Sequence, residues 1–146
     1  RYIRRQRQMC IRDSRARTGC PGHKTTTAHC HGGVISHHLL LCATATKAKC
    51  CDPALGAASW EALKLGVREL ALERPDRPGG VVLRSKADCL RVCDQGPVLL
   101  IWPDGIWYGG VTPERIRRIL EEHVIGGRPC EDWVIRRSPF SVTDQR

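Results

Sequence analysis

From residue 34 onward, short apolar runs alternate with polar segments, a pattern typical of a small protein built around a sheet. The run Leu39–Cys42 predicts a buried strand, and the β-branched run Val81–Leu83 predicts a second one. Val98–Trp102 and Ile106–Tyr108 predict two more strands, joined by turn residues at 103–105. The last two strands should therefore form a β-hairpin.

Two segments carry the spacing of an amphipathic helix. Apolar residues recur at helical intervals at Trp60, Leu63, Val67, Leu70 and Ala71. Ser59 is placed to cap this first helix, which should run to about Leu72. Thr112 and Pro113 predict the start of a second helix that ends at the glycine pair 126–127, with His123 near its end to complement the helix dipole. The element order β-α-β-β-β-α predicts an α/β fold in which helices flank a small mixed sheet.

The two ends of the chain differ from this central part. Residues 1–33 lack strand or helix periodicity and are predicted to be a disordered tail. The segment Met9–Ser14 reverse-translates to a sequence that looks like an adapter from sequencing-library preparation, so the tail is also interpreted as a translation artefact. We expect residues 34–127 to form the domain and residues 128–146 a C-terminal extension over its surface, docked through Trp133 and Ile135.

The charge distribution argues against a nucleic-acid partner. The 146 residues contain 24 Lys and Arg against 15 Asp and Glu, a formal net charge of +9. Residues 1–33 hold 8 of the basic and 1 of the acidic side chains, so the rest of the chain is nearly balanced. A nucleic-acid footprint would have to lie in the tail alone. No run approaches the roughly 18 apolar residues of a membrane span, and no membrane partner is expected.

Nine cysteines are too many for an ordinary cytoplasmic protein without a special use for them. Their odd number disfavours a fully disulfide-paired secreted protein, so we expect a cytoplasmic location with metal-bound thiolates. Cys42 follows the first strand, with Cys50 and Cys51 in the next loop, and Cys89 and Cys93 follow the second strand. Four thiolates from two loops are typical of structural zinc or of an iron–sulfur cluster, and spacing separates these only in part.

Several motifs give this arrangement a family resemblance. They are His38–Cys42, Lys49–Cys51, Ala87–Pro97 with its C-x3-C pair and Gly-Pro, and Trp102–Pro113. Residues 34–146 resemble the thioredoxin-like 2Fe-2S ferredoxin family through these motifs. The resemblance implies a thioredoxin-like fold, a 2Fe-2S cluster, one-electron transfer to redox partner proteins, and a homodimer. The implied cluster ligands are Cys42, Cys51 (or Cys50), Cys89 and Cys93.

The second ligand remains open at this point. The first loop is shorter than is common in that family, and two adjacent cysteines compete. Counting from Gly56 and the helix start favours Cys51 over Cys50. Basic residues beside the loops, including Lys86 and Arg91, are expected to favour the reduced cluster. The leading hypothesis is an electron carrier and not an enzyme.

Two other functions stay open. One is a zinc-stabilised, redox-inert interaction module. The other is a thiol-disulfide oxidoreductase that uses Cys50 and Cys51 or the pair Cys89 and Cys93.

Overall fold

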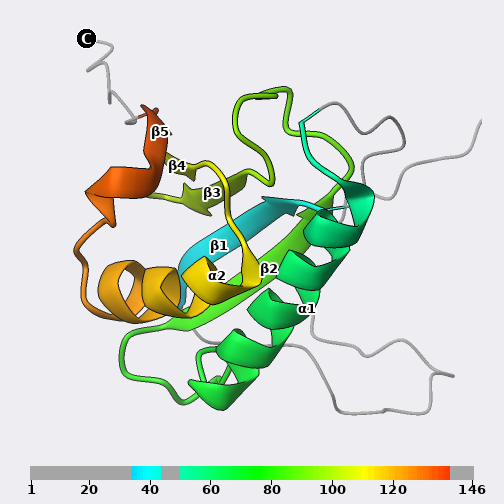
Figure 1. Cartoon of the computed structure of the whole chain (residues 1–146). Helices are drawn as coiled ribbons and strands as arrows, with labels where there is room; N and C mark the ends of the chain where they lie inside the picture. Colours follow the sequence, from blue (N-terminus) through cyan, green and yellow to red (C-terminus); the bar gives the residue numbers. More distant parts are fainter. Residues whose placement is uncertain (1–33, 44–49, 139–146) are drawn as a thin grey trace, which may run out of the picture. The chain divides into compact units, whose positions relative to one another are not determined.

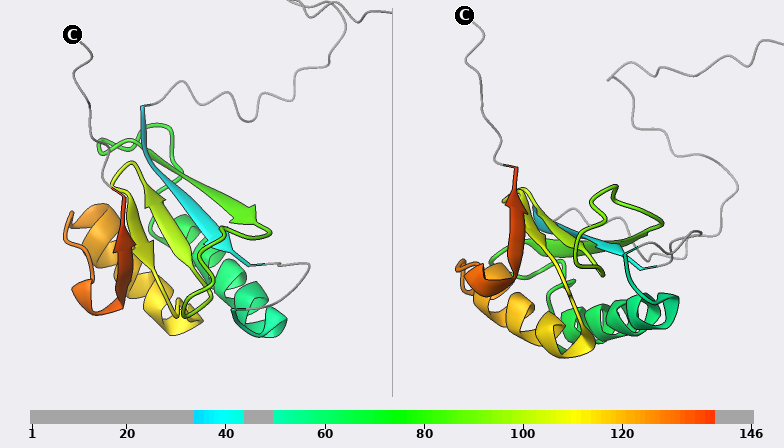
Figure 2. Two further views of the ribbon diagram at one scale, coloured as in Figure 1. Left: turned by 90° about the horizontal axis from the view of Figure 1, so that it is seen from above. Right: turned by 45° about the horizontal axis from the view of Figure 1, so that its top comes forward.

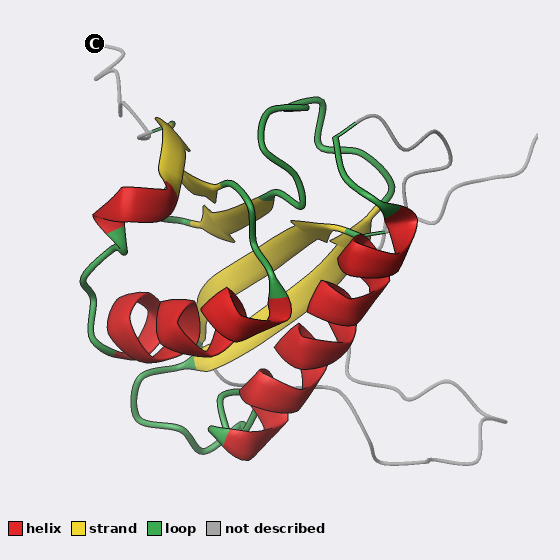
Figure 3. Cartoon of the chain, viewed as in Figure 1, coloured by secondary structure: helices red, strands yellow, loops and turns green. Residues whose placement is uncertain are grey.

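The structure is a computed structural model that describes residues 34–43 and 50–138. The N-terminal segment 1–33 lies outside the described residues, and so do the predictions of disorder and of an artefact made for it. The described part forms one five-stranded sheet with two helices against it (Figure 1, Figure 3). This arrangement confirms the predicted α/β class with a small mixed sheet.

The sheet has the strand order β2-β1-β3-β4-β5. Its strands are β1 (Ile35–Cys42), β2 (Val81–Ala87), β3 (Leu99–Trp102), β4 (Ile106–Tyr108) and β5 (Val134–Arg137). β1 pairs with β2 in parallel, and the other neighbouring pairs are antiparallel. A parallel pair requires a crossover connection, and α1 (Pro53–Glu69) supplies it.

Both helices cover the same face of the sheet (Figure 2). α2 (Pro113–Ile119) continues directly into a wider helical turn, η1 (Leu120–Ile125), and a short helix η2 (Glu131–Trp133) leads into β5. Among the helices of the described ranges, none combines the length and the hydrophobicity needed to cross a bilayer.

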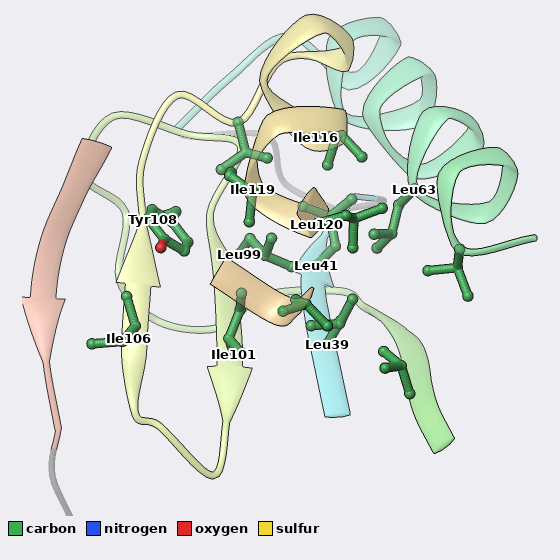
Figure 4. Packing of buried hydrophobic residues seen from close by; sticks show 14 of the residues in the cluster. Leu39, Leu41, Leu63, Leu99, Ile101, Ile106, Tyr108, Ile116, Ile119 and Leu120 are labelled. Atoms are coloured by element: carbon green, nitrogen blue, oxygen red, sulfur yellow. The ribbon is translucent and has the colours of Figure 1, made fainter. Parts of the chain in front are cut away.

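The core lies between the helices and the sheet (Figure 4). Leu39 and Leu41 from β1 are fully buried because alternate side chains of a strand point to the same face. They pack in one cluster with Ile116, Ile119 and Leu120 from the second helical segment. This packing fixes β1, and therefore the position of Cys42 at its end.

The first helix begins earlier than the sequence pattern predicts. Asp52 is its N-cap: the carboxylate accepts a 2.8 Å hydrogen bond from the backbone N–H of Ala54, and Pro53 occupies the first turn. Ser59, the predicted cap, is buried inside the helix, and its hydroxyl donates to the carbonyl of Leu55 at 2.9 Å. The prediction of a Ser59 cap is therefore wrong.

The C-terminal extension also differs from expectation. Instead of lying over the surface, residues Val134–Arg137 form β5 and pair antiparallel with β4. The Trp133 ring packs against the core and lies under the guanidinium groups of Arg115 and Arg118, at 4.9 and 5.0 Å. Sequence periodicity missed this strand because its residues, Val-Ile-Arg-Arg, do not alternate between apolar and polar.

Candidate metal centre

The ends of β1 and β2 bring the two cysteine loops to one edge of the sheet. Cys42, the last residue of β1, is the register partner of Ala87, the last residue of β2. The backbone N–H of Ala43 donates to the carbonyl of Ala87 at 3.2 Å. Because the two strands are parallel, the segments that follow them start side by side (Figure 2, left).

The first loop ends in the adjacent cysteines and then in the helix. Residues 44–49 lie outside the described part, while Cys50 and Cys51 are half-buried directly before the Asp52 cap. The N-terminus of α1 thus begins within three residues of both thiols. The positive end of a helix dipole favours a negative charge, but burial and the nearby Cys50 and Asp52 outweigh it and raise the pKa of the Cys51 thiol.

The second loop, from Asp88 to Pro97, carries the exposed thiols of Cys89 and Cys93. Arg91 adopts a left-handed backbone conformation with φ of 60°. In this turn the backbone N–H of Arg91 donates to the Cys89 sulfur at 3.3 Å. Amide donors of this kind stabilise negative charge on a sulfur ligand.

The Cys42 thiol lies where the two loops meet. Its side chain is buried, and its sulfur donates to the carbonyl of Asp88 at 3.6 Å. Burial raises the pKa of the Cys42 thiol to about 11, a backbone hydrogen bond from Leu90 lowers it, and the nearby Cys50 and Cys89 raise it further. Binding of a metal by this thiol would therefore displace a proton from it.

The five thiols named in the sequence analysis thus lie at or just beyond the ends of β1 and β2, and they differ in which other thiols they contact. Cys42 interacts with Cys50 and Cys89, whereas Cys51 is hydrogen-bonded to Cys50, with burial as the main cause of its raised pKa. Cys93 is exposed on the same loop as Cys89. Within the ranges that the structure describes, no three His, Cys, Asp or Glu side chains are gathered closely enough to hold a metal ion.

The chemistry of these donors fits a soft metal centre. The candidate donors at this edge of the sheet are thiols, which suit zinc or an iron–sulfur cluster. None of the six described cysteines is paired in a disulfide. Sequence reasoning identified the thiols but missed the backbone donors of Leu90 and Arg91, because an amide N–H gives no signal in a sequence pattern.

Comparison with solved structures identifies the fold. The chain superposes on a thioredoxin-like [2Fe-2S] ferredoxin from Aquifex aeolicus with a TM-score of 0.60, covering 73% of this chain and 96% of that one at 24% identity. A second structure of the wild-type Aquifex aeolicus protein gives a TM-score of 0.58 at 25% identity and covers 71% of this chain and 100% of that one. The described domain therefore has the thioredoxin-like fold of this class of proteins.

Comparison with curated sequences places the chain in the family. It is 31% identical over 99 residues to a Priestia megaterium protein named "Putative 2Fe-2S ferredoxin", covering 68% of this chain and 69% of the relative. No family model matches the sequence. The chain belongs to the thioredoxin-like 2Fe-2S ferredoxin family.

Two further relatives match over shorter segments. The 2Fe-2S ferredoxin of Aquifex aeolicus is 47% identical over 49 residues, and that of Clostridium pasteurianum is 37% identical over 46 residues. These matches cover 34% and 32% of this chain. They span less than half of each relative, at 44% and 45% of its length.

Proposed function

We propose that this protein is an electron carrier that binds a 2Fe-2S cluster through Cys42, Cys89, Cys93 and one of the adjacent pair, Cys51 or Cys50. The observation that carries the proposal is the convergence of the two cysteine loops at the ends of β1 and β2, where the Cys42 sulfur lies 3.6 Å from the carbonyl of Asp88, the residue before Cys89. Family membership supports the same conclusion, since the relatives are named 2Fe-2S ferredoxins.

The protein's part in this function is to supply and stabilise four thiolates. A bound 2Fe-2S cluster would provide a centre that accepts and releases one electron. The loops hold the sulfur atoms at the end of a rigid parallel strand pair, and Leu90 and Arg91 direct amide donors at two of them. Such donors offset the negative charge that reduction increases.

The exposure of the thiols is unequal. Cys42 is only 4% exposed, whereas Cys89 and Cys93 are exposed at the surface. A centre held between them would be anchored on one side and accessible to a redox partner protein on the other. We expect the protein to exchange electrons with such partner proteins and, as the resemblance implies, to form a homodimer. We also expect it to act in the cytoplasm, where reducing conditions keep unbound thiols reduced.

Single serine substitutions test the ligand set. Cys42→Ser, Cys89→Ser and Cys93→Ser should each lose most of the bound iron or shift the visible absorption bands, because serine replaces a soft sulfur ligand by a hydroxyl. Cys50→Ser and Cys51→Ser should differ from one another, since only one of the two is needed. Iron and sulfide per chain, together with the visible spectrum, are the measurements.

Cys130→Ser is the matched control. Cys130 is buried in the core, 4% exposed, and its sulfur lies 3.7 Å from a carboxylate oxygen of Glu122, on the second helical segment. This substitution should leave iron content and spectrum unchanged. Full retention of iron in the Cys42, Cys89 or Cys93 variant would contradict the assigned ligand set.

A further inference from the structure

Two adjacent cysteines, Cys50 and Cys51, offer one more sulfur than a four-thiolate centre needs. Cys42, Cys89 and Cys93 supply three ligands in the proposed function, on which this inference rests, and only one place remains. Cys50 and Cys51 lie in a loop directly before α1, so the packing of the loops must decide which sulfur reaches the site.

The contacts of the two thiols differ. Cys50 is a hydrogen-bond partner of Cys42, which in turn interacts with Cys89 of the second loop. The groups that act on Cys51 are Cys50 and the neighbouring carboxylate of Asp52. Cys50 therefore interacts with Cys42 directly, whereas Cys51 interacts with Cys50 and Asp52.

Gly96 of the second loop touches Cys50 directly. A Cβ atom placed on Gly96 would lie 2.7 Å from the Cys50 sulfur, 2.9 Å from its Cβ and 3.0 Å from its carbonyl oxygen. Separations below 3.0 Å are closer than non-bonded carbon contacts allow. Cys50 therefore occupies the space that a side chain at position 96 would fill.

We propose that Gly96 is a positioning residue that admits the sulfur of Cys50, and not that of Cys51, to the cluster. The close approach includes the Cβ and backbone of Cys50, so rotation of its side chain alone cannot relieve a Cβ at position 96. Gly96 does not have a positive φ, so alanine at this position avoids the strain of the left-handed region. The effect of Gly96→Ala is thus steric and acts on Cys50.

The test combines Gly96→Ala with Cys50→Ser and Cys51→Ser, using iron and sulfide per chain and the visible spectrum of full-length protein as readouts. In the unsubstituted background, Cys50→Ser should lower cluster content several-fold while Cys51→Ser retains it. Gly96→Ala should lower cluster content several-fold by itself, and adding Cys50→Ser should lower it no further. This lack of additivity is the signature of two residues that act through one contact.

Gly66→Ala is a control that introduces an equally close first contact elsewhere in the fold. A Cβ on Gly66 would lie 2.7 Å from the Leu120 side chain, within the packing of the helices and away from both cysteine loops. It should lower the thermal stability but leave cluster content dependent on Cys50. Circular dichroism of the metal-free Gly96→Ala variant checks whether it folds. If it does not fold, the two serine variants in the unsubstituted chain still decide between Cys50 and Cys51.

The experiments distinguish a failure of the proposed function from a failure of the role of Gly96. A wild-type protein without a 2Fe-2S cluster would overturn the proposed function itself. A wild-type protein that holds the cluster but loses it with Cys51→Ser, or that keeps full cluster content in Gly96→Ala, would overturn only the role of Gly96.

Discussion

At the scale of single residues, His123 shows how burial decides the role of a polar side chain. It is 2% exposed, and its Nδ1 lies 2.8 Å from the Tyr108 hydroxyl while its Nε2 lies 2.8 Å from a carboxylate oxygen of Asp104. The Tyr108 hydroxyl also accepts from the backbone N–H of Cys130 at 3.1 Å, so its own proton is available for His123. The network therefore suits a neutral imidazole that accepts from Tyr108 and donates to Asp104.

This network predicts a loss of stability in mild acid. Burial lowers the pKa of His123 below its ordinary value of 6.5, although Asp104 opposes the shift, and His37 and Arg137 add to it. Below pH 6.5 the unfolded chain therefore binds a proton at His123 more readily than the folded chain does. The free energy of unfolding should decrease as the pH is lowered from 6.5 to the pKa of His123 in the folded protein. Urea unfolding at a series of pH values from 7 to 5 measures this dependence.

His123→Gln keeps a donor and an acceptor at this position but does not titrate in this range. The variant should show a weaker pH dependence than the wild type over the same range. Equal dependence in the two proteins would show that His123 is not responsible. His37, whose Nε2 lies 3.4 Å from Asp104, would then be the next residue to substitute.

The sequence could not reveal this role. A histidine near the end of an apolar helix predicts an interaction with the helix dipole. Its true partners, Tyr108 and Asp104, are 15 and 19 residues away along the chain and come from β4 and the turn before it. Only the packing of the helix against the sheet brings them together.

Among the helices and strands, the sequence predicted those boundaries that depend on residues close together in the chain. Thr112 and Pro113 correctly marked the start of α2, and the turn between β3 and β4 was predicted from its own residues. The start of α1 was misassigned because Ser59 and Asp52 are both good capping residues. Asp52 prevails because Pro53 follows it and the backbone N–H of Ala54 reaches its carboxylate.

The second cysteine loop predicts a measurable electrostatic effect. Lys86 and Arg91 are exposed and flank Cys89. Replacing both with Gln should lower the midpoint potential of the bound cluster, since their positive charges favour its more negative, reduced form. Solvent screening limits the shift to tens of millivolts at most, on a scale where ~59 mV is a tenfold change for one electron. Anaerobic redox titration is the measurement.

Arg68 and Arg128 provide the matched control for charge. Both are exposed and lie outside the two cysteine loops, at the end of α1 and after η1. Their replacement with Gln removes the same total charge and should shift the midpoint potential less. An equal or larger shift in the control would mean that net charge, and not the position of Lys86 and Arg91, sets the effect.

At the scale of the whole described domain, topology explains why distant cysteines become neighbours. The parallel pairing of β1 and β2 requires α1 as a crossover, and it places Cys42 beside Ala87 despite their separation along the chain. The return strand β3 then runs antiparallel to β1. The backbone N–H of Cys42 donates to the carbonyl of Val98 at 2.9 Å, which ties the end of the second loop to the end of β1.

The sequence predicted the fold class and the cysteine loops because strand ends and breakers are local features. The preference between Cys50 and Cys51 could not follow from residue counting. In our proposal it depends on Gly96, which approaches Cys50 closely only once the second loop folds against the first. Close approach between two loops depends on tertiary packing, and no repeating pattern of residues in the sequence predicts it.

The visible absorption spectrum tests whether the protein carries a reducible 2Fe-2S cluster. It is recorded on the full chain, produced with adequate iron and sulfide and purified anaerobically, before and after addition of dithionite. We predict a coloured protein with iron and sulfide bound in equal amounts, whose visible bands partly bleach on reduction and return on reoxidation. A colourless protein that binds zinc and has no reducible band would contradict the account and favour a redox-inert module.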